Sequence, residues 1–276
     1  MDLWALFVAL ILGMVEGLTE FAPISSTGHM IIVDDVLLHS KELFSAPTAN
    51  SFKVVIQLGS ILAVVVVFKA RFLDLLGIRK NLPVNRGYTK RLSLTHIIIG
   101  LIPAAVLGFL FEDYIDEHLF TVQTVIIGLV LGAFLMMMAD WYRARGPRIE
   151  SVDQMSYAQA LGMGLFQCIG LWPGFSRSGS TISGGVLLGL SHRAAADFTF
   201  IMAVPVMLGA SGLSLIKNWQ YFTMDALPFF IVGFVSAFVF ALLCIRFFLK
   251  LINRIKLVPF AVYRIFLAAL IWVVYL

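Results

Sequence analysis

Long apolar stretches separated by short polar segments dominate this chain. Six of these stretches are long enough to cross a lipid bilayer, for which a helix needs about 20 mostly apolar residues. The predicted spans are residues 52–68, 95–111, 121–139, 197–216, 227–248 and 257–275. The pattern therefore predicts an all-α polytopic membrane protein with six transmembrane helices.

Two further apolar regions, residues 3–38 and 157–190, have a different pattern. Each is divided near its middle by proline and by a turn rich in hydroxyl-bearing residues. A broken backbone inside a membrane is tolerated only where it is buried in protein or lines a wet cavity. Because each half is also too short to cross, we predict two re-entrant helix pairs, which enter the membrane halfway and return.

Charges in the connections between spans predict the orientation. The 69–91 and 140–156 connections are rich in Lys and Arg, whereas the 112–120 connection holds acidic residues and no Lys or Arg. Basic loops are retained in the cytoplasm. We therefore expect the first two connections to be cytoplasmic and the third to lie outside.

The order of the predicted elements repeats within the chain. Residues 1–139 and 157–276 each hold one re-entrant pair followed by three spans, and an odd number of spans turns the second half upside down. FAPISSTG at 21–28 also corresponds to WPGFSRSG at 172–179. We interpret residues 1–276 as one membrane domain made of an inverted-topology repeat, with the functional site where the two breaks meet.

Composition supports the membrane class and excludes others. Hydrophobic residues make up 60% of the 276 residues, charged residues 13%, and the mean hydropathy is +0.95. These values lie outside the range of ordinary soluble domains. The net charge of +4 reports loop orientation rather than nucleic-acid binding, because the chain has no basic patch with interleaved aromatic residues.

The first break carries ionisable residues that are costly inside a membrane. Glu16 and Glu20 are four residues apart and would share one face of a helix, and a carboxylate near the bilayer centre costs about 2.5–3.5 kcal/mol on insertion scales. Pro23 is expected to end this helix. Hydroxyl-bearing residues suited to start the next helix follow, and then an imidazole: Ser25, Ser26, Thr27 and His29. This arrangement favours an anion site.

The second break places a cation at a helix start. Pro173 and Gly174 should end one half-helix, and Ser176 should cap the next. Its first turn then holds Arg177, Ser178, Ser180 and Thr181. A cation at this position is unfavourable beside the positive N-terminal end of the helix dipole. An anion that binds both the cation and the helix end would explain its presence. With phosphate as the anion, the carboxylates of the first break could hold a divalent cation or take a proton from a nucleophile.

These motifs resemble the signatures of the undecaprenyl-diphosphate phosphatase family, the bacterial membrane phosphatases associated with bacitracin resistance. EGLTEF, PISSTGH, PGFSRSGST and VVIQLGSILAVVV carry the resemblance. It implies hydrolysis of undecaprenyl (polyprenyl) diphosphate to undecaprenyl phosphate and inorganic phosphate, which recycles the lipid carrier of cell-wall synthesis. It also implies a bacterial inner-membrane location, with the active site opening to the periplasmic side.

Matching positions carry the family's functional residues onto this chain. The resemblance implies a divalent cation, Mg²⁺ or Ca²⁺, which Glu16 and Glu20 would hold. The expected catalytic residues are Ser26, Glu20, His29 and Arg177. Apart from the resemblance, the hydroxyl-bearing residues at the two helix starts are the expected substrate-binding residues: Ser25, Thr27, Ser176, Ser178 and Thr181. The expected partners are the polyprenyl diphosphate substrate and membrane lipid, without nucleic acid, and a homodimer is a further hypothesis.

Some features also have other interpretations. Inverted repeats with broken helices are typical of transporters, so a transporter or flippase for a phosphorylated lipid or small anion is the alternative function. Ser26, a potential nucleophile beside potential bases, favours chemistry. Whether Ser26 or water attacks stays open, as does the choice of Glu20 or His29 as the base. Ser25 is a good helix cap, and Asp140 and His96 lie near segment ends, where solvated side chains are expected.

Overall fold

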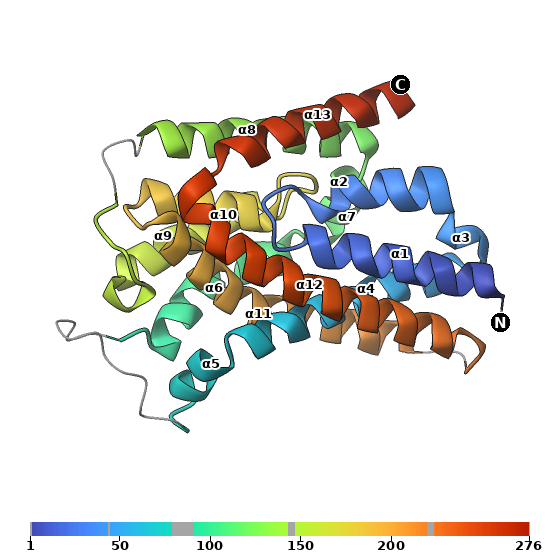
Figure 1. The fold of residues 1–276 in the computed structure, drawn as a ribbon, viewed down its shortest axis with the longest axis horizontal. Coiled ribbons are helices and arrows are strands. Elements are labelled where there is room, and N and C mark those ends of the chain that lie inside the picture. Colours follow the sequence, from blue (N-terminus) through green and yellow to red (C-terminus); the bar gives the residue numbers. More distant parts are fainter. Residues whose placement is uncertain (1, 44, 79–90, 143–146, 220–223, 276) are drawn as a thin grey trace.

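The computed structural model describes residues 2–43, 45–78, 91–142, 147–219 and 224–275. Within these ranges the regular structure is helical, apart from one isolated bridge between Ile149 and Leu190. Most helices lie side by side along the long axis of the molecule (Figure 1). Part of the predicted cytoplasmic 69–91 connection, residues 79–90, lies outside the described residues.

Each predicted span corresponds to a helix, with somewhat different limits. These helices are α4 (Ala46–Val67), α6 (Leu94–Leu110), α8 (Val122–Tyr142), α11 (His192–Lys217), α12 (Leu227–Ile255) and α13 (Val258–Tyr275). Among the described residues, five are long and apolar enough to cross a membrane alone, and α6 qualifies only together with α7 (Glu112–His118), from which it is bent by 67°. The chain is therefore an all-α polytopic membrane protein with five or six spans.

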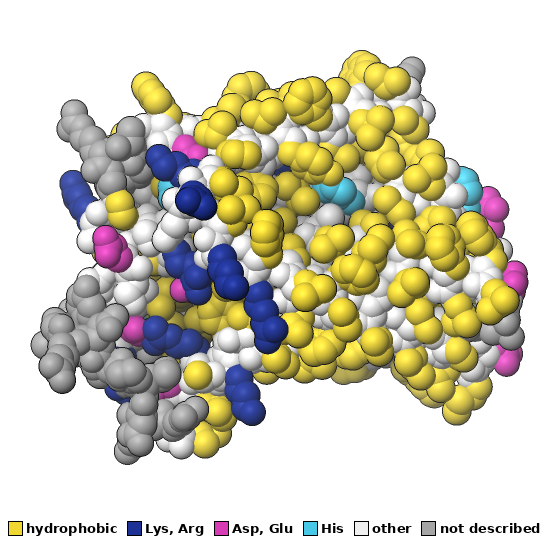
Figure 2. Space-filling model, viewed as in Figure 1, with side chains coloured by type: hydrophobic (Ala, Val, Ile, Leu, Met, Phe, Trp, Pro, Cys, Tyr) yellow, Lys and Arg dark blue, Asp and Glu magenta, His cyan; other side chains and the backbone are white. Residues whose placement is uncertain are grey.

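Shorter helices connect the long ones. They are α3 (Ser40–Leu43), α5 (Lys69–Leu75) and the single 3-10 turns Val152–Gln154 and Met224–Ala226. Figure 2 shows Lys and Arg side chains gathered toward one end of the visible face, with hydrophobic side chains over much of the remainder. The exposed basic residues at the C-terminal end of α12 are Arg246, Lys250, Arg254 and Lys256. This distribution agrees with the basic loops read from the sequence.

Both interrupted regions are helix pairs joined by a turn. The first pair is α1 (Leu3–Thr19) and α2 (Ser26–Met30) with its π-helical continuation Ile31–Leu38, and the second is α9 (Tyr157–Ile169) and α10 (Arg177–Leu187). At about 1.5 Å per residue, α1 is about 25 Å long and α9 about 20 Å, less than the roughly 30 Å hydrocarbon core. The predicted break of each region into two short helices is confirmed.

The first helix ends earlier than predicted. Pro23 was expected to end it, but α1 stops at Thr19. Glu20 stands at the C-cap with helical backbone angles, and its N–H donates to the Glu16 carbonyl at 3.0 Å. The intervening residues form the turn that carries the chain to α2.

Each broken helix packs against a span from the other half of the chain. α1 lies along α12 and α9 along α6, while α4 packs on α11 and α8 on α13. Small residues permit the close approach: a Cβ atom on Gly17 of α1 would lie 2.7 Å from the Ala241 nitrogen of α12. Close contacts through glycine are a common way for membrane helices to associate.

Two polar residues near helix ends are buried rather than solvated. The Asp140 carboxylate accepts hydrogen bonds from the backbone N–H groups of Leu257 and Val258, at 2.8 and 3.0 Å, and lies 2.6 Å from His192 Nε2. His96 Nε2 lies 3.1 Å from the Met155 carbonyl. The expectation of solvated side chains is wrong because Asp140 of α8 satisfies backbone donors at the start of α13, which the helix itself leaves without partners.

Candidate active site

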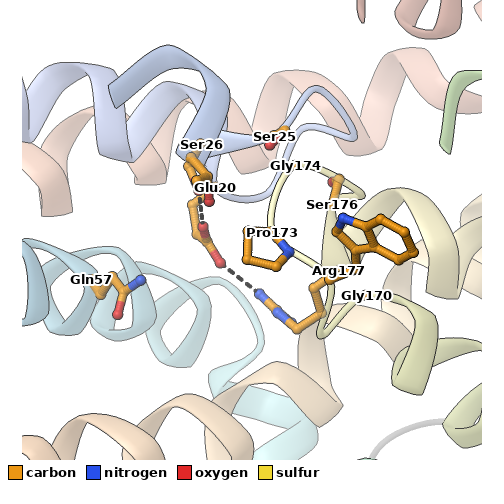
Figure 3. Close-up of a pocket in the computed structure, with 11 residues that line it drawn as sticks. Glu20, Ser25, Ser26, Gln57, Gly170, Pro173, Gly174, Ser176 and Arg177 are labelled. Carbon is orange, nitrogen blue, oxygen red and sulfur yellow. Dashed lines mark hydrogen bonds and ion pairs between the residues drawn. The ribbon is translucent and has the colours of Figure 1, made fainter. Parts of the chain in front are cut away.

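A cavity of about 160 Å³ lies where the two broken helices meet (Figure 3). Its lining combines a carboxylate, hydroxyls, an amide and a guanidinium with the backbone of the second turn. The lining residues are Glu20, Ser25, Ser26, Thr27, Gln57, Gly170, Trp172, Pro173, Gly174, Ser176 and Arg177. The pocket is thus built from residues of both interrupted regions, as the sequence predicted, together with Gln57 of α4.

Glu20 joins the two breaks. Its Oε2 accepts a hydrogen bond from Ser26 Oγ at 2.6 Å, and its Oε1 pairs with Arg177 Nη2 at 2.9 Å (Figure 3). The carboxylate therefore contacts a hydroxyl of the first break and a cation of the second. This arrangement can take a proton from Ser26 while Arg177 stabilises negative charge beside it.

The two turns have matching local geometry. Ser25 caps α2 and Ser176 caps α10, and each has a φ of +72° with a ψ of 101° and 112°, respectively. Their hydroxyls accept hydrogen bonds from the backbone N–H groups of Gly28 and Gly179, at 3.4 and 3.2 Å. Positive φ is uncommon for non-glycine residues and often marks functional sites. The capping predicted for both serines is confirmed.

Arg177 has a hydrogen-bond donor to spare. It is the first residue of α10, and its side chain is 14% exposed. Nη2 contacts Glu20 and Met207 Sδ, whereas Nη1 is buried without a hydrogen-bond partner among the described residues. Burial of an unpaired charged donor is costly. An anion in the pocket that Arg177 lines would be a suitable partner.

Sequence reasoning did not single out two residues of the pocket. Gln57 is a polar residue within an otherwise apolar stretch of α4, and that contrast was an available signal. Trp172 donates its indole N–H to the Thr124 carbonyl of α8 at 3.0 Å, which fixes the ring at the pocket wall. Its neighbour Pro173 is a predicted helix breaker, but nothing in the sequence indicates where the Trp172 indole lies.

His29 lies outside the pocket lining. Nδ1 is 2.7 Å from the Ser25 carbonyl, and Nε2 is 2.7 Å from the Tyr263 hydroxyl of α13. Because a carbonyl only accepts, Nδ1 carries a proton, and in a neutral ring Nε2 would accept from the Tyr263 hydroxyl. Among the described residues both ring nitrogens are thus engaged away from Ser26, which favours Glu20 over His29 as the base.

Two of the expected substrate-binding hydroxyls are also outside the lining. Ser178 Oγ is buried and donates to the Ala22 carbonyl at 3.2 Å, which ties the second break to the first. Thr181 is fully buried, and its Oγ1 donates to the Arg177 carbonyl at 2.7 Å. Both hydroxyls thus bind backbone carbonyls of the two breaks and do not line the pocket.

Glu16, the second expected cation ligand, lies one helical turn before Glu20 but is not among the residues that line the pocket. Its side chain is 3% exposed, and Oε1 has no hydrogen-bond partner among the described residues. Hard divalent cations bind carboxylate oxygens and readily keep water ligands. No cluster of three or more His, Cys, Asp or Glu side chains suited to a metal occurs within the described ranges. Glu16 and Glu20 would accordingly need water and substrate oxygens to complete the coordination.

The fold and the pocket define a helical membrane protein with a polar pocket, lined by Glu20 and Arg177 among others, between two broken helices. The chain belongs to the family described as Bacitracin resistance protein BacA, which matches residues 9–270. It is 70% identical over 275 residues to the undecaprenyl-diphosphatase of Geobacillus sp. (strain WCH70), covering 100% of both chains. It is also 65% identical over 271 residues to the undecaprenyl-diphosphatase of Bacillus subtilis (strain 168), covering 98% of both. The predicted family is confirmed.

Proposed function

We propose that this protein hydrolyses undecaprenyl diphosphate to undecaprenyl phosphate and inorganic phosphate, and so recycles the lipid carrier of cell-wall synthesis. The observation that carries the proposal is the contact of Glu20 with both Ser26 and Arg177 inside the pocket. These groups are a nucleophile, a base and an anion-binding cation. Relatives named undecaprenyl-diphosphatase that match the full chain support the same activity.

The terminal phosphate of the substrate would occupy the pocket. Arg177 would donate from Nη1 to its oxygens, with the hydroxyl of Thr27 and the amide of Gln57 within the same lining. Phosphoryl transfer is accelerated mostly by positioning and charge stabilisation. The leaving group is a lipid monophosphate whose second pKa is about 6, so it departs as an anion without a strong general acid.

Ser26 is the proposed nucleophile. Glu20 Oε2 takes the proton from Ser26 Oγ, and Oγ bonds to the terminal phosphorus as the bond from phosphorus to the bridging oxygen breaks. Undecaprenyl phosphate leaves with the electron pair of that bond. Water then attacks the phosphorus of the phosphoserine as the bond from phosphorus to Oγ breaks. Oγ takes back the proton that Glu20 holds, and inorganic phosphate is released as dihydrogen phosphate, which carries both protons of the water.

A divalent cation, Mg²⁺ or Ca²⁺, would be held by Glu16 and Glu20 and would supply positive charge against the phosphate oxygens. The buried Glu16 oxygen without a hydrogen-bond partner among the described residues supports this assignment. Arg177, which also pairs with Glu20, would neutralise the remaining phosphate charge.

Phosphate release from purified protein tests the function. We expect inorganic phosphate to be released from undecaprenyl diphosphate, to fall to background with a chelator, and to return with excess Mg²⁺ or Ca²⁺. Undecaprenyl phosphate, which lacks the anhydride bond, serves as the control substrate. A folded protein that releases no phosphate under any of these conditions would contradict the proposal and favour the transporter alternative.

The proposed location is the bacterial inner membrane, with the pocket opening to the periplasm. Basic residues at the C-terminal end of α12 and in the 140–156 connection support a cytoplasmic position for that end. The reciprocal packing of α1 on α12 and α9 on α6, with the matched caps Ser25 and Ser176, supports the inverted repeat of residues 1–139 and 157–276. A homodimer stays a hypothesis, which the mass of the purified protein would decide.

Cysteine labelling tests the orientation. In a background with Cys168 and Cys244 replaced by alanine, we expect a membrane-impermeant maleimide applied to intact cells lacking an outer membrane to modify Glu117→Cys and not Glu150→Cys. Both positions are exposed and lie in the connections predicted to face opposite sides. Permeabilised cells, in which both cysteines should react, provide the control. The opposite labelling pattern would contradict the proposed orientation.

Arg177→Lys is expected to lower kcat by about 10²-fold, the loss typical for one positioned donor of a transition-state anion. Lysine keeps the charge but loses the planar pair of donors that can contact Glu20 and a phosphate together. Steady-state phosphate release measures the effect, with Arg254→Lys at an exposed position of α12 as the matched control. A loss of less than about threefold would show that the fork geometry is unimportant.

A further inference from the structure

Arg264 of α13 is a buried cation that the proposed mechanism does not use. It is 0% exposed, and none of the ion pairs among the described residues includes it. Lysine and arginine inside membrane proteins are rare and usually mark functional positions. A fully buried guanidinium without a carboxylate therefore needs an explanation.

The hydrogen bonds of Arg264 lead to the second break. Nη2 donates to the Gly174 carbonyl at 2.9 Å and to the Gly128 carbonyl of α8 at 3.0 Å. Gly174 lines the pocket and has a φ of +86°, a conformation that favours glycine. The guanidinium thus holds the turn against α8, two residues before the cap Ser176.

Glycines make the space that the guanidinium occupies. A Cβ atom on Gly132 of α8 would lie 2.8 Å from Arg264 Cζ, and one on Gly179 of α10 would lie 3.0 Å from Nη1. Gly179 is also the residue whose N–H donates to the Ser176 cap. Arg264 therefore lies directly behind the first turn of α10, the turn that begins with Arg177.

The neighbouring residue on α13 contacts the first break. The Tyr263 hydroxyl lies 2.7 Å from His29 Nε2, and the two rings stack with 5.6 Å between centroids. Consecutive residues of one helix therefore hold both broken segments. α13 is the last helix of the chain and lines no part of the pocket itself.

We propose that Arg264 is a positioning residue, which fixes the Gly174 carbonyl so that Ser176 and Arg177 face the pocket in the geometry that binds the phosphate group. The proposal deepens the proposed function and rests on it. The positive charge of Arg264 near the N-terminal turn of α10 also adds to the positive potential that favours an anion there. Lysine cannot reproduce this role, because it lacks the planar guanidinium that fills the space beside Gly132 and Gly179 while Nη2 donates to both carbonyls.

The test compares Arg264→Lys and Arg264→Met with Arg246→Met, a change at an exposed position of α12. Thermal unfolding, kcat and KM for undecaprenyl diphosphate, and the Kd for inorganic pyrophosphate are measured for each. We expect Arg264→Lys to keep the wild-type Tm, to lose about tenfold or more in kcat, and to bind pyrophosphate more weakly, because small displacements of a positioned group are costly. Arg264→Met should lose more, and Arg246→Met should match the wild type.

Wild-type kcat and pyrophosphate affinity in Arg264→Lys would overturn the proposal. A collapse of Tm in both variants would also overturn it, since Arg264 would then serve packing alone. Pyrophosphate binding is measured without turnover. A wild type that binds pyrophosphate but releases no phosphate would thus refute the proposed function, while the affinities of the variants would still decide the role of Arg264.

Discussion

Glu20→Gln should lower phosphate release by about 10³-fold, within the range that general-base catalysis contributes. An amide oxygen can still accept from Arg177, but it cannot take the proton of Ser26, which donates to Glu20 at 2.6 Å. The change removes one negative charge and almost no volume. The loss should appear in kcat with the fold intact, as judged by the thermal unfolding temperature.

Glu117→Gln is the matched control, because Glu117 is exposed and is not among the residues that line the pocket. Glu16→Gln distinguishes the role of the Glu16 carboxylate from that of the Glu20 carboxylate. It leaves the contact of Glu20 with Ser26 in place, so activity should recover in part when the Mg²⁺ or Ca²⁺ concentration is raised. Near-full activity in both Glu16→Gln and Glu20→Gln would mean that the pair is structural.

The broken helices could be predicted because the membrane leaves the chain few alternatives. Pro23 and Pro173, each next to hydroxyl-rich segments inside apolar regions, are tolerated only where the backbone lies in protein or a wet cavity. The order of the elements then placed the two breaks, and so Glu20 and Arg177, at one site, but the sequence did not predict the direct contact between these two side chains. Local sequence also identified the caps Ser25 and Ser176.

Contacts between distant helices could not be predicted in the same way. The partner of His29 is Tyr263, which is separated from it by 234 positions. Tyr263 and Arg264 belong to an apolar span whose periodicity does not reveal which face meets the breaks. The burial of Asp140 likewise depends on how the end of α8 meets the start of α13. These features depend on helix packing, which a single sequence does not specify.

The partners of the hydroxyls at the start of α10 could not be predicted from the sequence either. The sequence offered Ser178 and Thr181 together with Ser176 as substrate ligands, but only Ser176 lines the pocket. Ser178 instead donates to a carbonyl of the opposite break, and Thr181 donates to the carbonyl four residues before it. Serine and threonine commonly satisfy nearby backbone groups, and the sequence does not show which hydroxyls will do so.

Ser26→Ala should reduce turnover at least as severely as Glu20→Gln, because covalent catalysis has no substitute for the attacking oxygen. Rapid quenching of the wild type during turnover of substrate labelled in its terminal phosphate should trap label on Ser26. Ser25→Ala is the neighbouring control: Ser25 caps α2, so its loss should lower stability by about 1 kcal/mol without removing the trapped label.

The pair of variants decides which oxygen attacks. If Ser26 attacks, Ser26→Ala and Glu20→Gln both lower turnover severely, since the proton that Glu20 accepts belongs to Ser26 Oγ. If water attacks instead, Glu20 would activate that water, so Glu20→Gln would stay severe while Ser26→Ala would keep substantial turnover and trap no label. Loss of a hydrogen-bond partner would then be the only effect of removing the hydroxyl. Substantial turnover in Ser26→Ala would therefore exclude the phosphoserine route. Glu20 would then act as the base that deprotonates an attacking water molecule.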